Sequence, residues 1–126
     1  MELEGATVLV VEDDEDTRDV MRAMLELCGA KVLVAESAKS GLETFERARP
    51  DAIVSDIAMP GEDGYWLVRE VARRMNTRDV PAVAVTAYAG QHPRDKALAA
   101  GFRAHLAKPV DPEVPCRTVA EVMTAD

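Results

Sequence analysis

Five short apolar runs alternate with five segments of helical periodicity along the chain. The runs cover residues 7–11, 31–35, 52–55, 82–86 and 104–107, and they are rich in valine and alanine. Short apolar runs with little polar alternation are typical of strands buried on both faces, as in parallel sheets. The repeated strand–helix order therefore predicts a doubly wound α/β fold with a five-stranded parallel sheet, because right-handed crossovers place helices on both faces.

The expected strand order is 2-1-3-4-5, with a switch point between the first and third strands. The chain has 126 residues, of which 48% are hydrophobic, which is enough to bury one core. We therefore expect a single domain over residues 1–126, with no residues left for a linker or a second domain.

The first and last helices carry the most specific expectations. The first has apolar residues at helical spacing, and Gly29 closes it. These residues are Val20, Met21, Met24, Leu25, Leu27 and Cys28. For the last helix, Asp111 and Pro112 form a suitable N-cap and N1 pair. Pro115 has no N–H and conflicts with that start, so the regular helix could also begin there.

Composition excludes several classes of function. The formal net charge of −8 argues against binding to a nucleic-acid backbone, which needs a basic face. No apolar run approaches the roughly 18 residues of a membrane span. Cys28 and Cys116 have no metal-binding or redox spacing, and we expect them to be reduced, half-buried thiols of a cytoplasmic protein.

Polar residues follow four of the five predicted strands directly. Glu12 and Asp13 end the first strand, Asp56 the third, Thr86 the fourth and Lys108 the fifth. Ligands of open α/β sheets bind outside the carboxyl ends of the strands, beside the switch point. We therefore expect three carboxylates, a hydroxyl and an ammonium group to meet in one cleft.

Three neighbouring carboxylates repel one another unless a cation joins them, and oxygen ligands with some water suit Mg²⁺. We expect Asp13 and Asp56 to bind the metal directly and Glu12 to bind it through water. The carbonyl oxygen of Ala58 is a further candidate ligand.

Such a site suits phosphoryl transfer. Asp56 would be the nucleophile and would form an aspartyl phosphate. Lys108 would pair with one phosphoryl oxygen, and the Thr86 hydroxyl would donate a hydrogen bond to another.

These residues resemble the receiver domain of response regulators in two-component signalling, the CheY-like family. The resemblance covers the chain from Thr7 to about Met123. Its motifs are Val11-Glu12-Asp13-Asp14, Asp56 to Gly61 with Asp63-Gly64, Thr86-Ala87 and Lys108-Pro109. The family has the strand order given above, so that expectation and the resemblance are not independent.

The resemblance implies that Asp56 takes its phosphoryl group from a phosphohistidine, with Mg²⁺. The donor would be a sensor histidine kinase, a hybrid kinase or a phosphotransfer protein of a phosphorelay. The domain would be a signalling module and no conventional enzyme, since it would catalyse only its own phosphorylation and slow dephosphorylation. Residues 101–111 are similar to receivers attached to hybrid kinases. The resemblance also implies a cis peptide bond before Pro109.

Phosphorylation would be relayed through Thr86 to the surface of the fourth helix, fifth strand and fifth helix, and from there to a partner or a fused output domain. His105 stands where many receivers have Tyr or Phe as the switch ring. It is either a surface histidine or an altered switch residue. Ala58 and Tyr88 offer no carboxylate or amide to orient attacking water, which predicts a long-lived phosphoryl group.

Three other interpretations remain open. A phosphatase of the haloacid-dehalogenase type would need a second Asp in the place of Ala58. A flavodoxin-like flavin binder would need a phosphate-binding loop where residues 12–16 are all acidic. An inactive interaction module would not need the complete set of polar residues.

Overall fold

The computed structural model describes residues 2–75, 79–87 and 90–124. Strands and helices alternate throughout, as expected. The strands are β1 (Thr7–Val11), β2 (Lys31–Ala35), β3 (Ala52–Asp56), β4 (Ala82–Thr86) and β5 (Ala104–Ala107). The helices are α1 (Glu15–Leu27), α2 (Ala38–Ala48), α3 (Gly64–Arg74), α4 (Gln91–Ala100) and α5 (Val114–Thr124).

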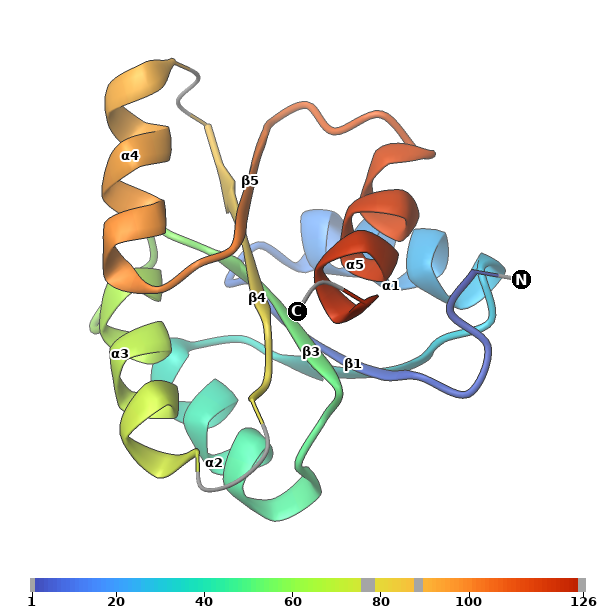
Figure 1. Cartoon of the computed structure of the whole chain (residues 1–126), viewed down its shortest axis with the longest axis horizontal. Helices are drawn as coiled ribbons and strands as arrows, with labels where there is room; N and C mark the ends of the chain where they lie inside the picture. The colour runs from blue at the N-terminus through green and yellow to red at the C-terminus, as the bar shows by residue number, and fades with distance from the viewer. Residues whose placement is uncertain (1, 76–78, 88–89, 125–126) are drawn as a thin grey trace.

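The sheet is parallel and has the order β2-β1-β3-β4-β5, which confirms the predicted fold. Helices α1 and α5 cover one face, and α2, α3 and α4 cover the other (Figure 1). Alternate residues of β1 serve the two faces: Val8 and Val10 pack with the α1–α5 core, and Leu9 and Val11 pack with the α2–α4 core. All four are essentially inaccessible, so β1 is a central strand buried on both sides.

Side-chain caps fix where three helices begin, and two of these caps lie close to the strand ends. Asp14 caps α1 by accepting a hydrogen bond from the backbone N–H of Thr17 at 2.9 Å. Asp63 caps α3 in the same way, accepting from the N–H of Trp66 at 2.9 Å. Each cap satisfies a backbone donor that would otherwise lack a partner. Ser37 caps α2.

Some boundaries and burial patterns differ from the prediction. Helix α5 begins at Val114, so Asp111 and Pro112 precede it and do not form its cap. With this start Pro115 lies in the first turn, where a missing N–H costs nothing. On α1, Met21 and Leu25 are buried, but Val20 and Leu27 are 53% and 80% exposed. The apolar stripe of α1 is therefore wider than the face that the core covers.

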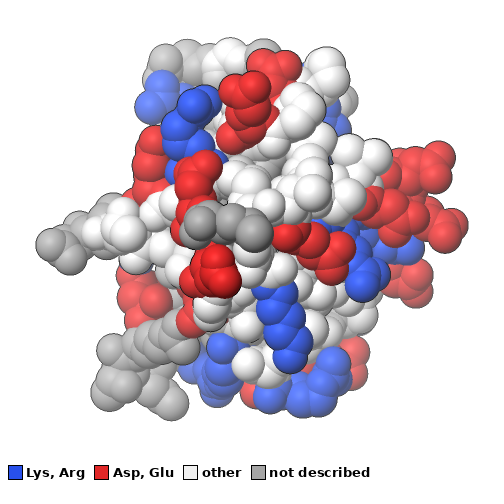
Figure 2. Space-filling model, turned by 90° about the vertical axis from the view of Figure 1, so that its right-hand side faces the viewer, with Lys and Arg blue, Asp and Glu red and all other residues white. Residues whose placement is uncertain are grey.

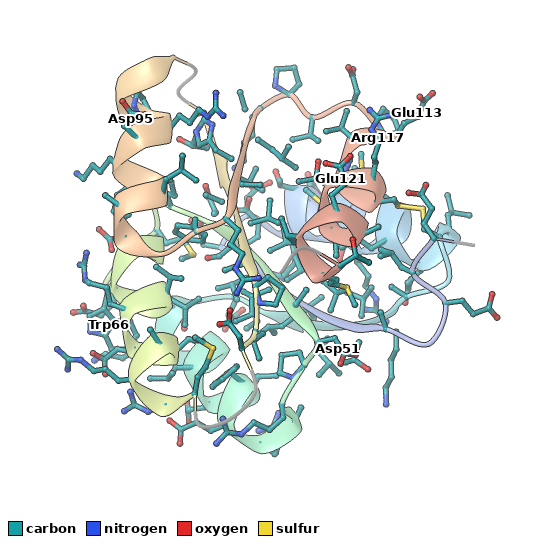
Figure 3. The ribbon with its side chains drawn as sticks, in the orientation of Figure 1. Asp51, Trp66, Asp95, Glu113, Arg117 and Glu121 are labelled. Carbon is teal, nitrogen blue, oxygen red and sulfur yellow. A yellow bond between two sulfur atoms is a disulfide. The ribbon has the colours of Figure 1, made fainter. Side chains whose placement is uncertain are left out.

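Cys28 and Cys116 form a disulfide bond, so the prediction of two reduced thiols is wrong. The bond joins the C-cap of α1 to the first turn of α5. In Figure 3 it is the yellow bond near the labelled Glu113 and Arg117. The two cysteines are 88 residues apart, and the packing of α1 against α5 brings them together.

None of the described helices is long and apolar enough to cross a bilayer.

Gly64 allows α3 to start directly against the end of β3. A Cβ atom at this position would lie 2.5 Å from the carbonyl oxygen of Asp56 and 2.9 Å from the Cα of Ile57. Both neighbours are backbone atoms, which cannot turn away as a side chain could. The N–H of Gly64 also donates to the Ile57 carbonyl at 2.8 Å, which holds the two elements together.

Replacing Gly64 by Ala should therefore lower the free energy of unfolding by about 2 kcal/mol, because the new methyl group forces backbone apart. Urea unfolding followed by circular dichroism measures this. Arg69→Ala, an exposed site on the same helix, should change the free energy by less than about 0.5 kcal/mol. Equal stability of Gly64→Ala and the wild type would show that the contact at the start of α3 is not tight.

Candidate functional site

Three carboxylates meet at the carboxyl edge of the sheet. Glu12 follows β1, and Asp56 is the last residue of the neighbouring strand β3. One oxygen from each of Glu12, Asp13 and Asp56 lies within 4.8 Å of the others. Glu12 and Asp56 are buried, at 4% and 7% exposure, whereas Asp13 is exposed to solvent. Two of the three charges are thus largely withdrawn from water.

Lys108 brings a positive charge into this cluster. Its Nζ lies 2.9 Å from Glu12 Oε1 and 3.3 Å from Asp56 Oδ2. The backbone N–H of Lys108 donates a hydrogen bond to the Thr86 carbonyl at 2.7 Å. The Lys108–Pro109 peptide bond is cis, as the family resemblance implied. Glu12 and Asp56, which lie 96 and 52 positions from Lys108 in the sequence, therefore share its ammonium group.

The titration behaviour reflects this crowding. Burial and a hydrogen bond to Glu12 raise the pKa of Asp13 above its ordinary value. Burial lowers the pKa of Lys108, but the hydrogen bond to Glu12 and the negative charge of Asp56 outweigh this effect and raise it overall. One ammonium group thus faces three carboxylates. The excess negative charge and the oxygen ligands suit a hard divalent cation.

Thr86 and Ala58 flank the cluster. Thr86 is the last residue of β4 and is buried at 4% exposure, one position beyond the residue that pairs with Asp56. Ala58 lies two residues after Asp56 in an exposed loop. Tyr88, the other residue expected near the phosphoryl group, lies outside the described residues.

Arg18 was not anticipated from the sequence. Its guanidinium donates to the Glu12 carbonyl at 3.0 Å, so α1 also holds the end of β1 from outside. An arginine one turn into a helix after an acidic loop carries no distinctive pattern, so the sequence alone offered no signal for this contact.

His105 is not a surface residue. It is half-buried on β5, and its buried Nε2 atom has no hydrogen-bond partner within the part of the chain that the structure describes. Val83 and Val85 of β4 pack in the α1–α5 core with Leu106, whereas the neighbouring Ala84 belongs to the opposite core. His105 pairs with Ala84 and therefore faces α4. Burial and the positive charge of Arg94 on α4 lower its pKa.

The sequence pattern of the response regulator receiver domain family matches residues 8–120. The chain belongs to this family. It is therefore a CheY-like receiver domain of the kind used in two-component signalling.

Relatives cover almost the whole receiver domain. An uncharacterized 14.6 kDa protein of Leptolyngbya boryana is 50% identical over 83% of this chain and 80% of its own length. Protein PilH of Pseudomonas aeruginosa is 31% identical over 94% of this chain and 98% of its own. The receiver domain of sensor histidine kinase PA1611 from P. aeruginosa, solved with a magnesium ion in its active-site cleft, is 35% identical with a TM-score of 0.86, covering 96% and 99% of the two chains.

The buried imidazole of this receiver domain should make its stability depend on pH. The ordinary pKa of histidine is 6.5, and the folded state lowers it. The folded state therefore binds fewer protons than the unfolded state between the two values. The stabilisation is complete above about pH 6.5 and is lost as the pH falls through the folded pKa.

His105→Phe should weaken the loss of stability between pH 8 and pH 5, which urea unfolding at several pH values measures. The carboxylates titrate in both proteins, so the difference between the two profiles isolates the imidazole. Parallel profiles would mean that the pKa of His105 is the same in the folded state as in the unfolded chain.

Proposed function

We propose that this receiver domain is a phosphoacceptor and that Asp56 takes a phosphoryl group from a phosphohistidine. The observation that carries the proposal is the environment of the Asp56 carboxylate, which is buried, adjacent to Glu12 and Asp13, and 3.3 Å from the Lys108 ammonium. A carboxylate that only stabilised the fold would not need two further carboxylates beside it, since their repulsion is destabilising.

In the transfer step an Asp56 oxygen attacks phosphorus, and an acyl phosphate bond forms as the bond to the donor imidazole nitrogen breaks. The imidazole leaves with the electron pair of that bond. Lys108 is placed to pair with a phosphoryl oxygen, because its ammonium already contacts Asp56. The Thr86 hydroxyl, at the end of the neighbouring strand, would donate a hydrogen bond to a second oxygen.

The oxygen ligands of Glu12, Asp13 and Asp56 fit Mg²⁺, and the carbonyl of Ala58 lies in the adjoining loop. We assign Asp13 and Asp56 as direct ligands and Glu12 as a ligand through water. When bound, Mg²⁺ would offset the charge on the phosphoryl oxygens. The magnesium-bound receiver domain of PA1611 supports this assignment by analogy.

The donor would be a sensor histidine kinase, a hybrid kinase or a phosphotransfer protein. A groove of about 500 Å³ runs beside the site between α1 and the segment after β5. It is lined by Val20, Met21 and Met24 on one side and by Lys108, Pro109 and Val110 on the other. Because Lys108 belongs to both the groove and the site, a donor helix docked along α1 could bring its phosphohistidine to Asp56.

The surface formed by α1 and α5 gives no support to nucleic acid as a partner. Figure 2 views the side on which α1 and α5 lie, and acidic and basic side chains are interspersed there around a largely uncharged middle. No continuous basic area appears among the described residues on this face. With the net charge of −8, this supports a protein partner or a fused output domain.

The output would pass through Thr86 and His105 to the surface formed by α4, β5 and α5. The Thr86 hydroxyl would follow the new anion, and the ring of His105 occupies the space beside α4. The two states would then differ in contacts that the phosphoryl group makes in only one of them.

Asp56→Asn should abolish phosphorylation, because an amide cannot form the acyl phosphate. Incubation with acetyl phosphate and Mg²⁺, followed by intact mass, should add one phosphoryl group to the wild type and none to the variant. Asp51→Asn, outside the site but also a carboxylate at a strand end, should be labelled like the wild type. Stoichiometric labelling of Asp56→Asn at another residue would contradict the assignment.

Ala58→Asn should shorten the lifetime of the phosphoryl group about tenfold or more, because the new amide could orient an attacking water. Decay of the labelled mass after removal of the donor measures the lifetime. Ala58→Val adds a side chain without a polar group and should leave the lifetime nearly unchanged. A wild-type lifetime of seconds that neither variant alters would show that Ala58 does not limit hydrolysis.

A further inference from the structure

The segment between Lys108 and Cys116 is held at both of its ends. At one end the Lys108 ammonium contacts Glu12 and Asp56. At the other end Cys116 is covalently bonded to Cys28. We call residues 108–116 the strap. It runs from the phosphoacceptor site to the end of α1 and forms one wall of the groove described above.

Between its ends the strap is supported by Val110, which packs against the α1–α5 core, and by Pro115, which is buried in α5. Pro109, Asp111, Pro112 and Glu113 are all exposed. The Val114 N–H donates a hydrogen bond to the Asp111 carbonyl at 3.1 Å, and this bond joins residues within the strap itself. Three of its residues, Pro109, Pro112 and Pro115, are prolines, which cannot donate such bonds. The exposed middle of the strap, residues 111–113, is therefore positioned by Lys108 and Val110 on one side and by the disulfide and α5 on the other.

The disulfide is not needed to complete the core. Both faces of the sheet are covered by buried apolar side chains, including Val119 and Val122 of α5 itself. A domain of this size with a full core does not require a covalent cross-link, unlike small disulfide-rich domains. The bond therefore adds a constraint that the fold could lose without unfolding.

The two cysteine residues differ in their exposure. Cys116 is 1% exposed, whereas Cys28 is half-buried at the end of α1. An external thiolate would reach Cys28 first. Its attack would form a mixed disulfide at Cys28 and release Cys116 as a thiolate, which takes up a proton.

We propose that Cys28 and Cys116 form a reversible thiol–disulfide couple that controls the mobility of the strap and of α5. A dithiol, of protein or small-molecule type, reduces the bond in two exchange steps and becomes a disulfide itself. In the reverse direction a disulfide of the same class accepts two electrons and two protons from the two cysteine thiols and becomes a dithiol. In the oxidised form α1 and α5 are linked. In the reduced form the strap keeps its Lys108 anchor, the packing of Val110 against the core and the packing of α5.

The mobility of the strap bears on the groove and on Lys108. Resting on the proposed function, we expect the reduced domain to differ from the oxidised one in its rate of phosphorylation, because the strap carries the lysine that faces Asp56. The couple and its effect on α5 do not depend on that function.

The first experiment asks whether the bond is reversible in the folded protein. The domain is equilibrated in glutathione buffers of increasing oxidised fraction, free thiols are alkylated and the intact mass is measured. Both cysteines should change from alkylated to protected together, while circular dichroism stays native. Alkylation of both cysteines in every buffer, or unfolding on reduction, would overturn the proposal.

The second experiment asks what the bond controls. Amide hydrogen exchange is compared between oxidised and reduced forms, and residues 108–124 should exchange about tenfold faster after reduction. Helix α2 lies on the opposite face and should not change. Cys28→Ser should match the reduced wild type in every buffer. Equal exchange of residues 108–124 in both forms would overturn the proposal.

A third comparison separates this proposal from the phosphoacceptor function. Acetyl phosphate is supplied with Mg²⁺ to the oxidised and the reduced forms. Different rates support the link to phosphorylation, and equal rates overturn that link alone. If neither form is labelled, the proposed function fails, while the exchange result still decides the thiol–disulfide couple.

Discussion

The contact of Lys108 with Glu12 and Asp56 is the interaction on which the rest of this receiver domain depends. It places one ammonium group at 2.9 and 3.3 Å from two buried carboxylates, with a third carboxylate beside them. Without a cation, this arrangement would be unfavourable, because buried like charges repel in a low dielectric. The fold therefore maintains a site with more negative charge than its own lysine can balance, which is the condition for binding a divalent metal and then a phosphoryl group.

The topology explains how residues so distant in sequence meet. Strands β1, β3 and β4 are neighbours in the sheet, so Glu12, Asp56 and Thr86 emerge at one edge. Lys108 comes from the outer strand β5 and reaches across β4 to the two acids. Tight packing of Gly64 against the end of β3 fixes the loop that follows Asp56. The disulfide then links the segment after Lys108 covalently to the end of α1. The site and the α1–α5 face are therefore connected through this segment.

Much of this could be predicted from the sequence because the signals are local. Each strand begins at the predicted residue, since apolar runs between turns need no knowledge of the rest of the chain. Features set by tertiary packing could not be predicted in this way. The disulfide depends on where α1 and α5 meet. The exposure of Val20 and Leu27 depends on how α1 is rotated, and the burial of His105 Nε2 depends on the packing of α4. For α5 the sequence offered two starts, an N-cap at Asp111 and a start at Pro115, and the helix begins at Val114, beside the second.

The most direct test of the central claim is anomalous diffraction from crystals of this domain soaked with Mn²⁺, which binds the same oxygen ligands as Mg²⁺ and is visible by its anomalous signal. The account predicts one strong peak between the carboxylates of Asp13 and Asp56, with Lys108 next to it. Crystals that show no peak there, or a peak bound only by surface acids elsewhere, would contradict it.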